Sequence, residues 1–267
     1  MKKKPAGFWF GAGLVCFVAL IAFVGPFFLS EKLSSFDLSQ RIHGPGPGHW
    51  FGFDEEGRDL LTLLVYGARV SLGVSLLTVF FCMLVGTLAG LIAGYFGGKL
   101  ESLFIFVTDI ILSFPSILLI IALAAFLREG SLFSLIVILS AVGWVGYARV
   151  VRGQVLSLKE RDFVKAATGM GAGTFRIWRQ HLFPNLLAPL MIQATFGMAG
   201  VILAESTLSF LGLGVSNLPS WGRLMDQGVQ YLLVAPHLAL FPGLAIAGLI
   251  MGFHFLGDGL RDYLDVK

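Results

Sequence analysis

Six long apolar stretches run through this chain, and they constrain its fold more than any other feature of the sequence. They cover residues 8–29, 70–95, 103–127, 132–151, 186–213 and 238–256. A helix that crosses about 30 Å of hydrocarbon needs about 20 mostly apolar residues. Because lipid offers no hydrogen-bond partners to a bare backbone, such a segment crosses the membrane as an α-helix. The pattern predicts an all-α membrane protein with six transmembrane helices.

The composition excludes two other classes of protein. Of the 267 residues, 56% are hydrophobic and 13% are charged, and the mean hydropathy is +0.84. A soluble domain carries about 25% charged residues, and a disordered chain needs low hydrophobicity and high net charge. The stretch at residues 8–29 is longer than the roughly 7–15-residue core of a signal peptide. We therefore expect an uncleaved first span.

The basic residues predict the orientation of the spans. With six spans, both ends of the chain lie on one side, and Lys and Arg are enriched in short cytoplasmic loops. Placing the ends inside gives the inside segments 13 of the 19 Lys and Arg residues, namely Lys2, Lys3, Lys4, Lys99, Arg149, Arg152, Lys159, Arg161, Lys165, Arg176, Arg179, Arg261 and Lys267. The outside segments hold Lys32, Arg41, Arg58, Arg69, Arg128 and Arg223. This asymmetry predicts that both ends are cytoplasmic, and it explains the net charge of +3 without nucleic acid.

The long inside segment, residues 156–185, has the pattern of a helical hairpin. Residues 156–168 lack Gly and Pro and predict a first helix. Its small and apolar residues are expected on one helical face: Phe163, Ala166, Ala167 and Met170.

Glycines and a proline delimit the second half of this segment. The three glycines within residues 169–173 predict a turn, because glycine adopts the left-handed conformations that tight turns need. Thr174 is a suitable N-cap for a second helix, which we expect to run to about His181 and to be stopped by Pro184. The residues leave two interpretations open, an amphipathic hairpin on anionic headgroups or a docking element for a soluble partner.

Two carboxylates and a proline fall inside predicted spans. Carboxylates in a membrane are costly and usually functional. Asp109 and Glu205 would serve a secondary transporter as proton or ion relays, whereas structural hydrogen bonding or pore lining are the alternatives. Pro115 removes a backbone hydrogen bond and predicts a kink, which either shapes a passage or only serves packing.

The sequence offers no catalytic or metal centre. The phosphate-binding pattern G-x-x-x-x-G-K-[ST] is absent, so any ATP hydrolysis must come from a partner. Cys16 and Cys82 lie in apolar runs, and the five histidines are scattered, without the clustered spacing of a metal site. We expect a membrane protein that binds no cofactor and no metal.

The inside segment resembles the EAA motif of permease subunits of ABC importers. Residues 165–171 read KAATGMG and residues 181–184 read HLFP. The family pattern is E-A-A, a glycine after three further residues, and later a hydrophobic-x-hydrophobic-Pro ending. Lys165 stands where the family usually has Glu, and His181 stands at a hydrophobic position.

Other segments resemble the dipeptide, oligopeptide and nickel branch of these importers. They are FGFDEEGRD at 51–59, YGARVSL at 66–72, AESTLSFLGLG at 204–214, PSWG at 219–222 and LGDGLRDYLD at 256–265. His254 replaces a usual Asn and Val266 a usual Pro. Taken together, the chain resembles the second permease subunit of such an importer.

The resemblance implies a fold and a set of partners. Residues 1–67 would form an N-terminal span and an extracytoplasmic segment, residues 68–257 a type I importer core, and residues 258–267 a cytoplasmic tail. The partners would be a homologous permease, two ATPases that use ATP-Mg, and an extracytoplasmic solute-binding protein, all at the bacterial cytoplasmic membrane. The mechanism would be alternating access.

The resemblance also implies roles for particular residues. The ATPase-coupling loop would include Phe163, Lys165, Ala166, Ala167, Met170, Gly171, His181 and Pro184. The candidate pore or gating residues are Asp109 and Pro115 in the third span, which the resemblance places among the pore-lining helices, and the intramembrane carboxylate Glu205 in the fifth. Short peptides are the expected cargo; the alternatives are nickel or another small solute and, from a different class, a proton-coupled secondary transporter.

Overall fold

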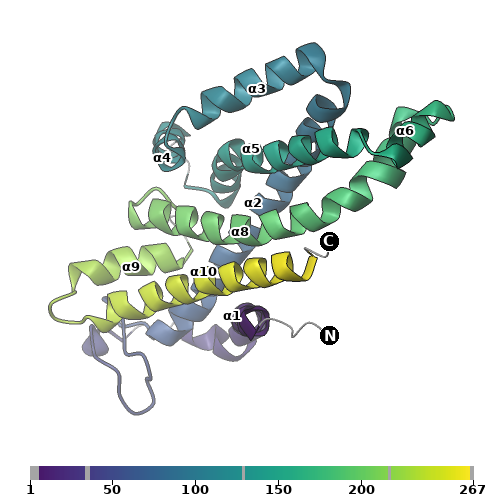
Figure 1. The fold of residues 1–267 in the computed structure, drawn as a ribbon. Coiled ribbons are helices and arrows are strands. Elements are labelled where there is room, and N and C mark those ends of the chain that lie inside the picture. Colours follow the sequence, from purple (N-terminus) through teal and green to yellow (C-terminus); the bar gives the residue numbers. More distant parts are fainter. Residues whose placement is uncertain (1–5, 34–36, 128–129, 216–217, 265–267) are drawn as a thin grey trace.

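The computed structural model describes residues 6–33, 37–127, 130–215 and 218–264. This part of the chain is helical, and its β-structure is confined to two isolated bridges, Gly46 with His49 and Phe53 with Asp59. Figure 1 shows the helices arranged as an elongated bundle. Five basic residues used to predict the orientation lie outside the described residues: Lys2, Lys3, Lys4, Arg128 and Lys267.

Five helices of the described chain are long and apolar enough to cross a membrane, which confirms the predicted fold class. They are α1 (Ala6–Leu33), α2 (Leu60–Phe96), α5 (Leu132–Lys159), α8 (Phe183–Phe210) and α10 (His237–Leu264). Helix α2 begins ten residues before its apolar stretch, because the Asp59 side chain accepts a hydrogen bond from the Thr62 backbone N–H at 2.9 Å and caps the first turn.

The third predicted span, residues 103–127, is not one continuous helix. The structure contains α3 (Gly98–Leu112) and α4 (Ser116–Leu127), which meet at an angle of 83°. Pro115 lies in the break, where its ring and missing N–H prevent the helix from continuing. With 12 residues, α4 is about 18 Å long and cannot cross the membrane alone. The expected kink is therefore a sharp break, and the sixth span exists only if the bent pair is counted as one.

Small residues bring α2 and α5 into backbone contact. Gly86, Gly90 and Gly94 recur every four residues and so share one face of α2. A Cβ added at Gly90 would lie 2.5 Å from the carbonyl oxygen of Ala148, and one added at Gly94 would lie 3.0 Å from the Cβ of Val155. Close approach through such small-residue spacing is the usual basis of helix association in lipid.

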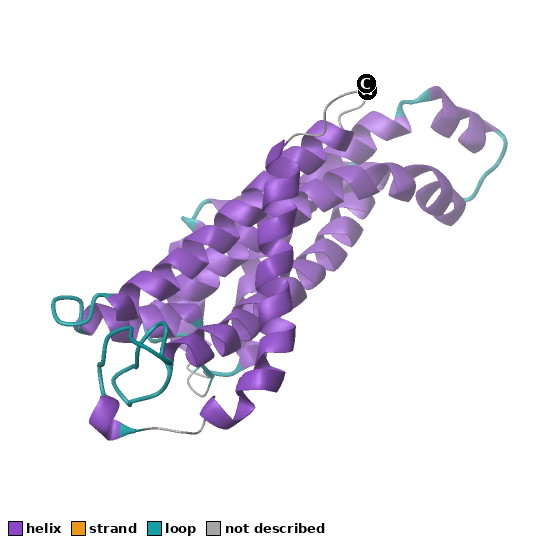
Figure 2. Ribbon diagram, turned by 90° about the horizontal axis from the view of Figure 1, so that it is seen from below, coloured by secondary structure: helices purple, strands orange, loops and turns teal. Residues whose placement is uncertain are grey.

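The first and last spans lie antiparallel. A Cβ added at Gly11 would come within 2.6 Å of the carbonyl oxygen of Gly252, and one at Gly259 within 2.5 Å of the Cβ of Phe8. The start of α1 and the end of α10 therefore lie at the same end of the bundle. Figure 2 shows α6 (Asp162–Gly169) and α7 (Thr174–Ile177) projecting at that end.

The opposite end carries the long connecting segment 37–59 and the short helix α9 (Trp221–Gln230). The segment includes the 3₁₀ turn η1 (Leu38–Gln40), whose cap Asp37 accepts hydrogen bonds from the backbone and the hydroxyl of Ser39. Trp221 donates its indole N–H to the carbonyl of Leu64 at 2.8 Å and fastens α9 to α2. Both ends of the bundle thus carry ordered structure outside the spans.

Candidate functional site

The hairpin predicted for residues 156–185 exists, with different boundaries. Helix α5 runs to Lys159, and a break at Glu160 and Arg161 precedes α6, so residues 156–168 are not one helix as expected. Thr174 is the first residue of α7, and Gly173 occupies the cap position without a side-chain hydrogen bond. The prediction that Thr174 caps this helix is therefore wrong.

The second arm of the hairpin does not stop at Pro184. It continues from α7 through the π-helical turn η2 (Trp178–Leu182) into α8, so that residues 174–210 form one helix. The Phe183 N–H bonds to the carbonyl of Trp178, five residues back. This wider turn lies directly before Pro184 and accommodates a residue that donates no backbone hydrogen bond. Pro184 therefore lies in the first turn of α8.

Gly171 forms the turn between the two arms. Its φ is 82°, in the left-handed region, whereas the backbones of Gly169 and Gly173 have no positive φ. The Gly171 N–H donates to the carbonyl of Thr168 at 2.9 Å, and the Ala172 N–H donates to that of Ala167 at 3.0 Å. These bonds close the end of α6 in the way that a left-handed glycine allows.

The hairpin buries apolar residues, three of which belong to the main core of the bundle: Val164, Ile177 and Leu182. Val164, Ala167, Ile177 and Leu182 are buried, with exposed fractions of at most 5%. Ala167 is therefore buried, and the expectation that it shares an exposed face with Ala166 and Met170 is wrong. Spacing explains the difference: Val164 and Ala167 are three residues apart and share one side of α6.

The outward residues form what we call the hairpin face: Phe163, Ala166, Met170 and Phe175. Phe163 and Ala166 follow one another at helical spacing along α6, and Met170 is the residue that caps its C-terminal end. Met170 is 82% exposed and Phe175 is 75% exposed. The sequence pattern did not single out Phe175, although a phenylalanine beside a glycine turn was visible in it. Apolar side chains this exposed at the end of a protein mark an interaction surface.

The base of the hairpin rests on the end of α2. The indole of Trp178 lies edge-on against the rings of Tyr95 and Phe96, with centroids 5.9 and 6.0 Å away. Lys159 donates from Nζ to the carbonyl of Gly94 at 3.2 Å. His181 is half-buried, and its ring lies 6.0 Å from that of Phe163. These contacts tie the hairpin to the bundle.

Lys165, which stands at the Glu position of the family motif, pairs with a neighbour in the chain. Its Nζ lies 3.0 Å from Oε2 of Glu160, and both side chains are exposed. The hydrogen bond and charge of Lys165 lower the pKa of the Glu160 carboxyl below its ordinary value.

Two ion pairs hold α3 against α5. Arg152 donates from Nε to Glu101 at 3.0 Å, and Arg149 pairs with Asp109. Asp109 is therefore one half of an ion pair, rather than the isolated carboxylate expected of a relay. Pro115 lies beyond these pairs, in the break between α3 and α4.

Glu205 is held by serine hydroxyls. The side chain is 1% exposed, and it accepts hydrogen bonds from Ser71 at 2.9 Å and from Ser209 at 2.8 Å. Since Ser71 belongs to α2 and the other two residues to α8, the carboxyl joins the two helices. Buried polar groups are stable only when paired in this way, so Glu205 has a structural role that the sequence left open.

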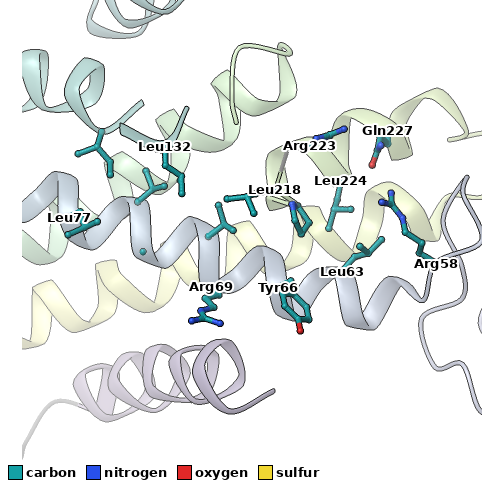
Figure 3. Close-up of a pocket in the computed structure, with 15 residues that line it drawn as sticks. Arg58, Leu63, Tyr66, Arg69, Leu77, Leu132, Leu218, Arg223, Leu224 and Gln227 are labelled. Carbon is teal, nitrogen blue, oxygen red and sulfur yellow. The ribbon is translucent and has the colours of Figure 1, made fainter. Parts of the chain in front are cut away.

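A cavity of about 700 Å³ lies at the end opposite the hairpin. It is lined by α2, the start of α5, residues 218–219 and α9, as Figure 3 shows. None of the three candidate pore residues, Asp109, Pro115 and Glu205, lines it. The sequence patterns did not single out this cavity, because its walls come from segments far apart in the chain.

The long apolar helices, the broken span and the hairpin at one end define an all-α permease of the cytoplasmic membrane. The family model described as "Binding-protein-dependent transport system inner membrane component" matches residues 86–267, and the chain belongs to this family. It is thus a transport component and a multi-pass protein of the bacterial inner membrane.

Relatives with named transport systems support this assignment. The dipeptide transport system permease protein DppC of Alkalihalophilus pseudofirmus is 43% identical over 93% of this chain and 82% of its own length. The protein of the same name from Bacillus subtilis is 39% identical over 96% of this chain and 81% of its own. The oligopeptide transport system permease protein OppC of Haemophilus influenzae is 37% identical over 95% and 82%.

A solved structure shares the fold. A chain of the methionine ABC transporter MetNI, in an inward-facing conformation, superposes with a TM-score of 0.61 at 22% sequence identity. The match covers 76% of this chain and 97% of that one. The fold of this chain is therefore that of an ABC importer permease.

Proposed function

We propose that this chain is one of two permease subunits of an ATP-driven importer of short peptides. A homologous permease would complete the passage, two ATPases would dock on the cytoplasmic side, and an extracytoplasmic binding protein would deliver cargo. ATP-Mg would be used by the ATPases, and this chain would bind no cofactor. Transport would proceed by alternating access across the cytoplasmic membrane.

The hairpin face is the observation that carries the ATPase-docking part of this proposal. It exposes Phe163, Met170 and Phe175 where the start of α1 and the end of α10 also lie. An aqueous surface of this kind is costly unless a partner covers it. The second arm is continuous with α8, so a partner bound at the hairpin is connected directly to a membrane span. An ATPase groove that binds this face would couple nucleotide-driven closure to the permease.

The names of the relatives support short peptides as the cargo. The three relatives described above are dipeptide or oligopeptide permeases, and they match this chain over more than 90% of its length. This similarity to peptide permeases therefore favours short peptides as the cargo over nickel or another small solute. A proton-coupled carrier finds no support in the carboxylates, because Asp109 and Glu205 are both engaged within the chain.

The experiment is reconstitution of the complete complex in liposomes. This chain would be co-purified with its partner permease, ATPases and binding protein. The reconstituted complex would then be supplied with labelled di- and tripeptides. We expect uptake that requires ATP and that persists when an uncoupler removes the proton gradient. Uptake that collapses with the uncoupler while ATP is present would contradict the proposal, as would transport of nickel but not of peptides.

A further inference from the structure

The cavity opposite the hairpin is shaped by one face of α2. Tyr66, Val70, Gly73 and Leu77 follow one another at spacings of three and four residues and therefore share a side of the helix. The opposing wall includes Leu132 from the start of α5. At about 700 Å³ the cavity has the size of sites that hold small molecules.

The charge of the cavity has one sign. Its charged lining residues in the described chain are Arg58, Arg69 and Arg223, and no Asp or Glu lines it. Arg58 is neutralised by Asp54 at 2.8 Å and by Glu56 at 3.1 Å. Arg69 is exposed and makes no ion pair or hydrogen bond with the described residues. The cavity therefore has an arginine available for a ligand.

The surroundings of Arg69 fit an anionic group at the end of an otherwise apolar molecule. Figure 3 shows Arg69 and Tyr66 projecting from the same side of α2, which in this view is the side away from Arg223 and Gln227 of α9. A guanidinium presents a planar fork of donors that matches a carboxylate. The remaining wall is largely aliphatic. Such a wall suits the small side chains of a ligand without selecting a particular one.

The charged end of the cavity lies where the long apolar stretch of α2 begins. Arg58, Arg223 and Gln227 belong to segments beyond the apolar stretches, and Arg69 directly precedes the stretch that begins at Val70. Arg69 itself lies in the third turn of α2, ahead of the long apolar stretch. A lipid phosphate would satisfy the same guanidinium, but the lining residues that lie outside the apolar stretches favour a soluble carboxylate.

We propose that this cavity receives the cargo by its terminal carboxylate, with Arg69 as the donor and the aliphatic face of α2 against the cargo's side chains. The inference rests on the proposed function, since it assumes peptide cargo. It makes Arg69 a binding residue and gives the permease a preference of its own for the free carboxyl end of the peptide.

Gly73 provides an independent test of the cavity. A Cβ added at Gly73 meets nothing within 4 Å, so the first atom of a larger side chain has room at this position in the cavity wall. Gly73→Leu is expected to fill the cavity, whereas Arg69→Gln removes only the charge. Arg41→Gln is the matched control, because Arg41 lies at the same end, is exposed, and contacts Tyr231 rather than the cavity.

The measurement is saturation-transfer NMR on the assembled permease–ATPase complex in nanodiscs of zwitterionic lipid, without the binding protein. The probes are Ala-Ala-Ala and its C-terminal amide. We expect the free acid to bind about fivefold better than the amide, as one partly solvated charge-assisted pair allows. Arg69→Gln should abolish this preference, Arg69→Lys should retain part of it, Gly73→Leu should weaken both probes, and Arg41→Gln should change neither.

Any of the following results would overturn the inference. Equal binding of acid and amide by the wild type, or an unchanged preference in Arg69→Gln, rules out carboxylate recognition by Arg69. Loss of the acid's signal on adding phosphatidylglycerol, with that lipid retained by wild type and not by Arg69→Gln, assigns the arginine to lipid. In these cases ATP-driven peptide uptake by the full complex still supports the proposed function. Absence of that uptake contradicts both the proposed function and the inference about Arg69.

Discussion

Gly197 of α8 lies directly against the phenolic oxygen of Tyr147 in α5: a Cβ added at Gly197 would be 1.9 Å from that oxygen. The Tyr147 hydroxyl is buried and has no hydrogen-bond partner among the described residues. The ring of Tyr147 therefore fits against α8 only because Gly197 has no side chain. This contact fixes how closely α5 and α8 approach.

Gly197→Ala is expected to destabilise the protein by about 1–3 kcal/mol, the usual cost of overpacking a core. Thermal unfolding in mild detergent measures it. Tyr147→Phe should relieve the change, because the next ring atom, Cζ, is 3.0 Å from the added Cβ. Gly200→Ala is the control, since its Cβ meets nothing within 4 Å. Equal unfolding temperatures for the two alanine variants would contradict the prediction.

Replacing Glu205 by Ala should cost about 1–3 kcal/mol, because hydroxyls of Ser71 and Ser209 lose their buried acceptor. Glu205→Gln keeps an acceptor oxygen and should cost less. A double-mutant cycle with Ser71→Ala separates the contribution of this pair. If the losses in unfolding free energy caused by the two substitutions are additive, the link between α2 and α8 through this carboxyl is not energetically significant.

Gly171→Ala should weaken ATPase retention and transport, while the permease remains inserted. An alanine at φ 82° costs about 1–2 kcal/mol in the turn, although no neighbouring atom blocks it. Gly169→Ala is the matched control, because Gly169 has no positive φ and equal space around it. Co-purification of the ATPases with each variant is the measurement. Normal retention by Gly171→Ala would show that the turn conformation is not needed for docking.

The pairing of Lys165 with Glu160 predicts a pH dependence. A carboxyl whose pKa is lowered on folding stabilises the fold above its ordinary pKa of 4.5, and this contribution is lost as the pH falls through the lowered value. The pair is therefore intact at pH 7. In a ¹³C NMR titration, Lys165→Ala should raise the Glu160 midpoint, and Lys159→Ala should raise it less, because Lys159 is a weaker cause of the shift. Identical midpoints in wild type and Lys165→Ala would refute the pairing.

The orientation remains a prediction that labelling can test. A tag within residues 159–179, at the hairpin, should be protected from an impermeant reagent in intact cells. A tag near Gly46, on the segment at the opposite end, should react. Reaction at the hairpin would reverse the topology and remove the proposed docking of ATPases.

The sequence predicted the spans well because lipid permits little besides helices. It missed the start of α2, where the apolar stretch at Val70 hid the cap formed by Asp59 and Thr62. It located Pro115 correctly but not the extent of the break, since an angle of 83° depends on how α3 and α4 pack against α5. A proline indicates where a helix is weak and not how far it turns.

The candidate site was predictable to the level of a hairpin and a glycine turn. The burial of Val164 was not, because it belongs to a core that includes Ile177 and Leu182, which reach it only after the second arm folds back. The serines around Glu205 were visible one by one, but their meeting joins Ser71 to residues more than 130 positions away. The cavity around Arg69 likewise requires segments that are distant in the chain.

The continuity of α7, η2 and α8 has a mechanical consequence. Residues 174–210 form a rod of 37 residues, about 55 Å long, with the hairpin at one end and the serine-held Glu205 near the other. Tilting a rod of this length by one degree displaces its far tip by roughly 1 Å. If a partner docks at the hairpin as proposed, a pivot of a few degrees about that end moves the far end of the helix by about the length of a hydrogen bond.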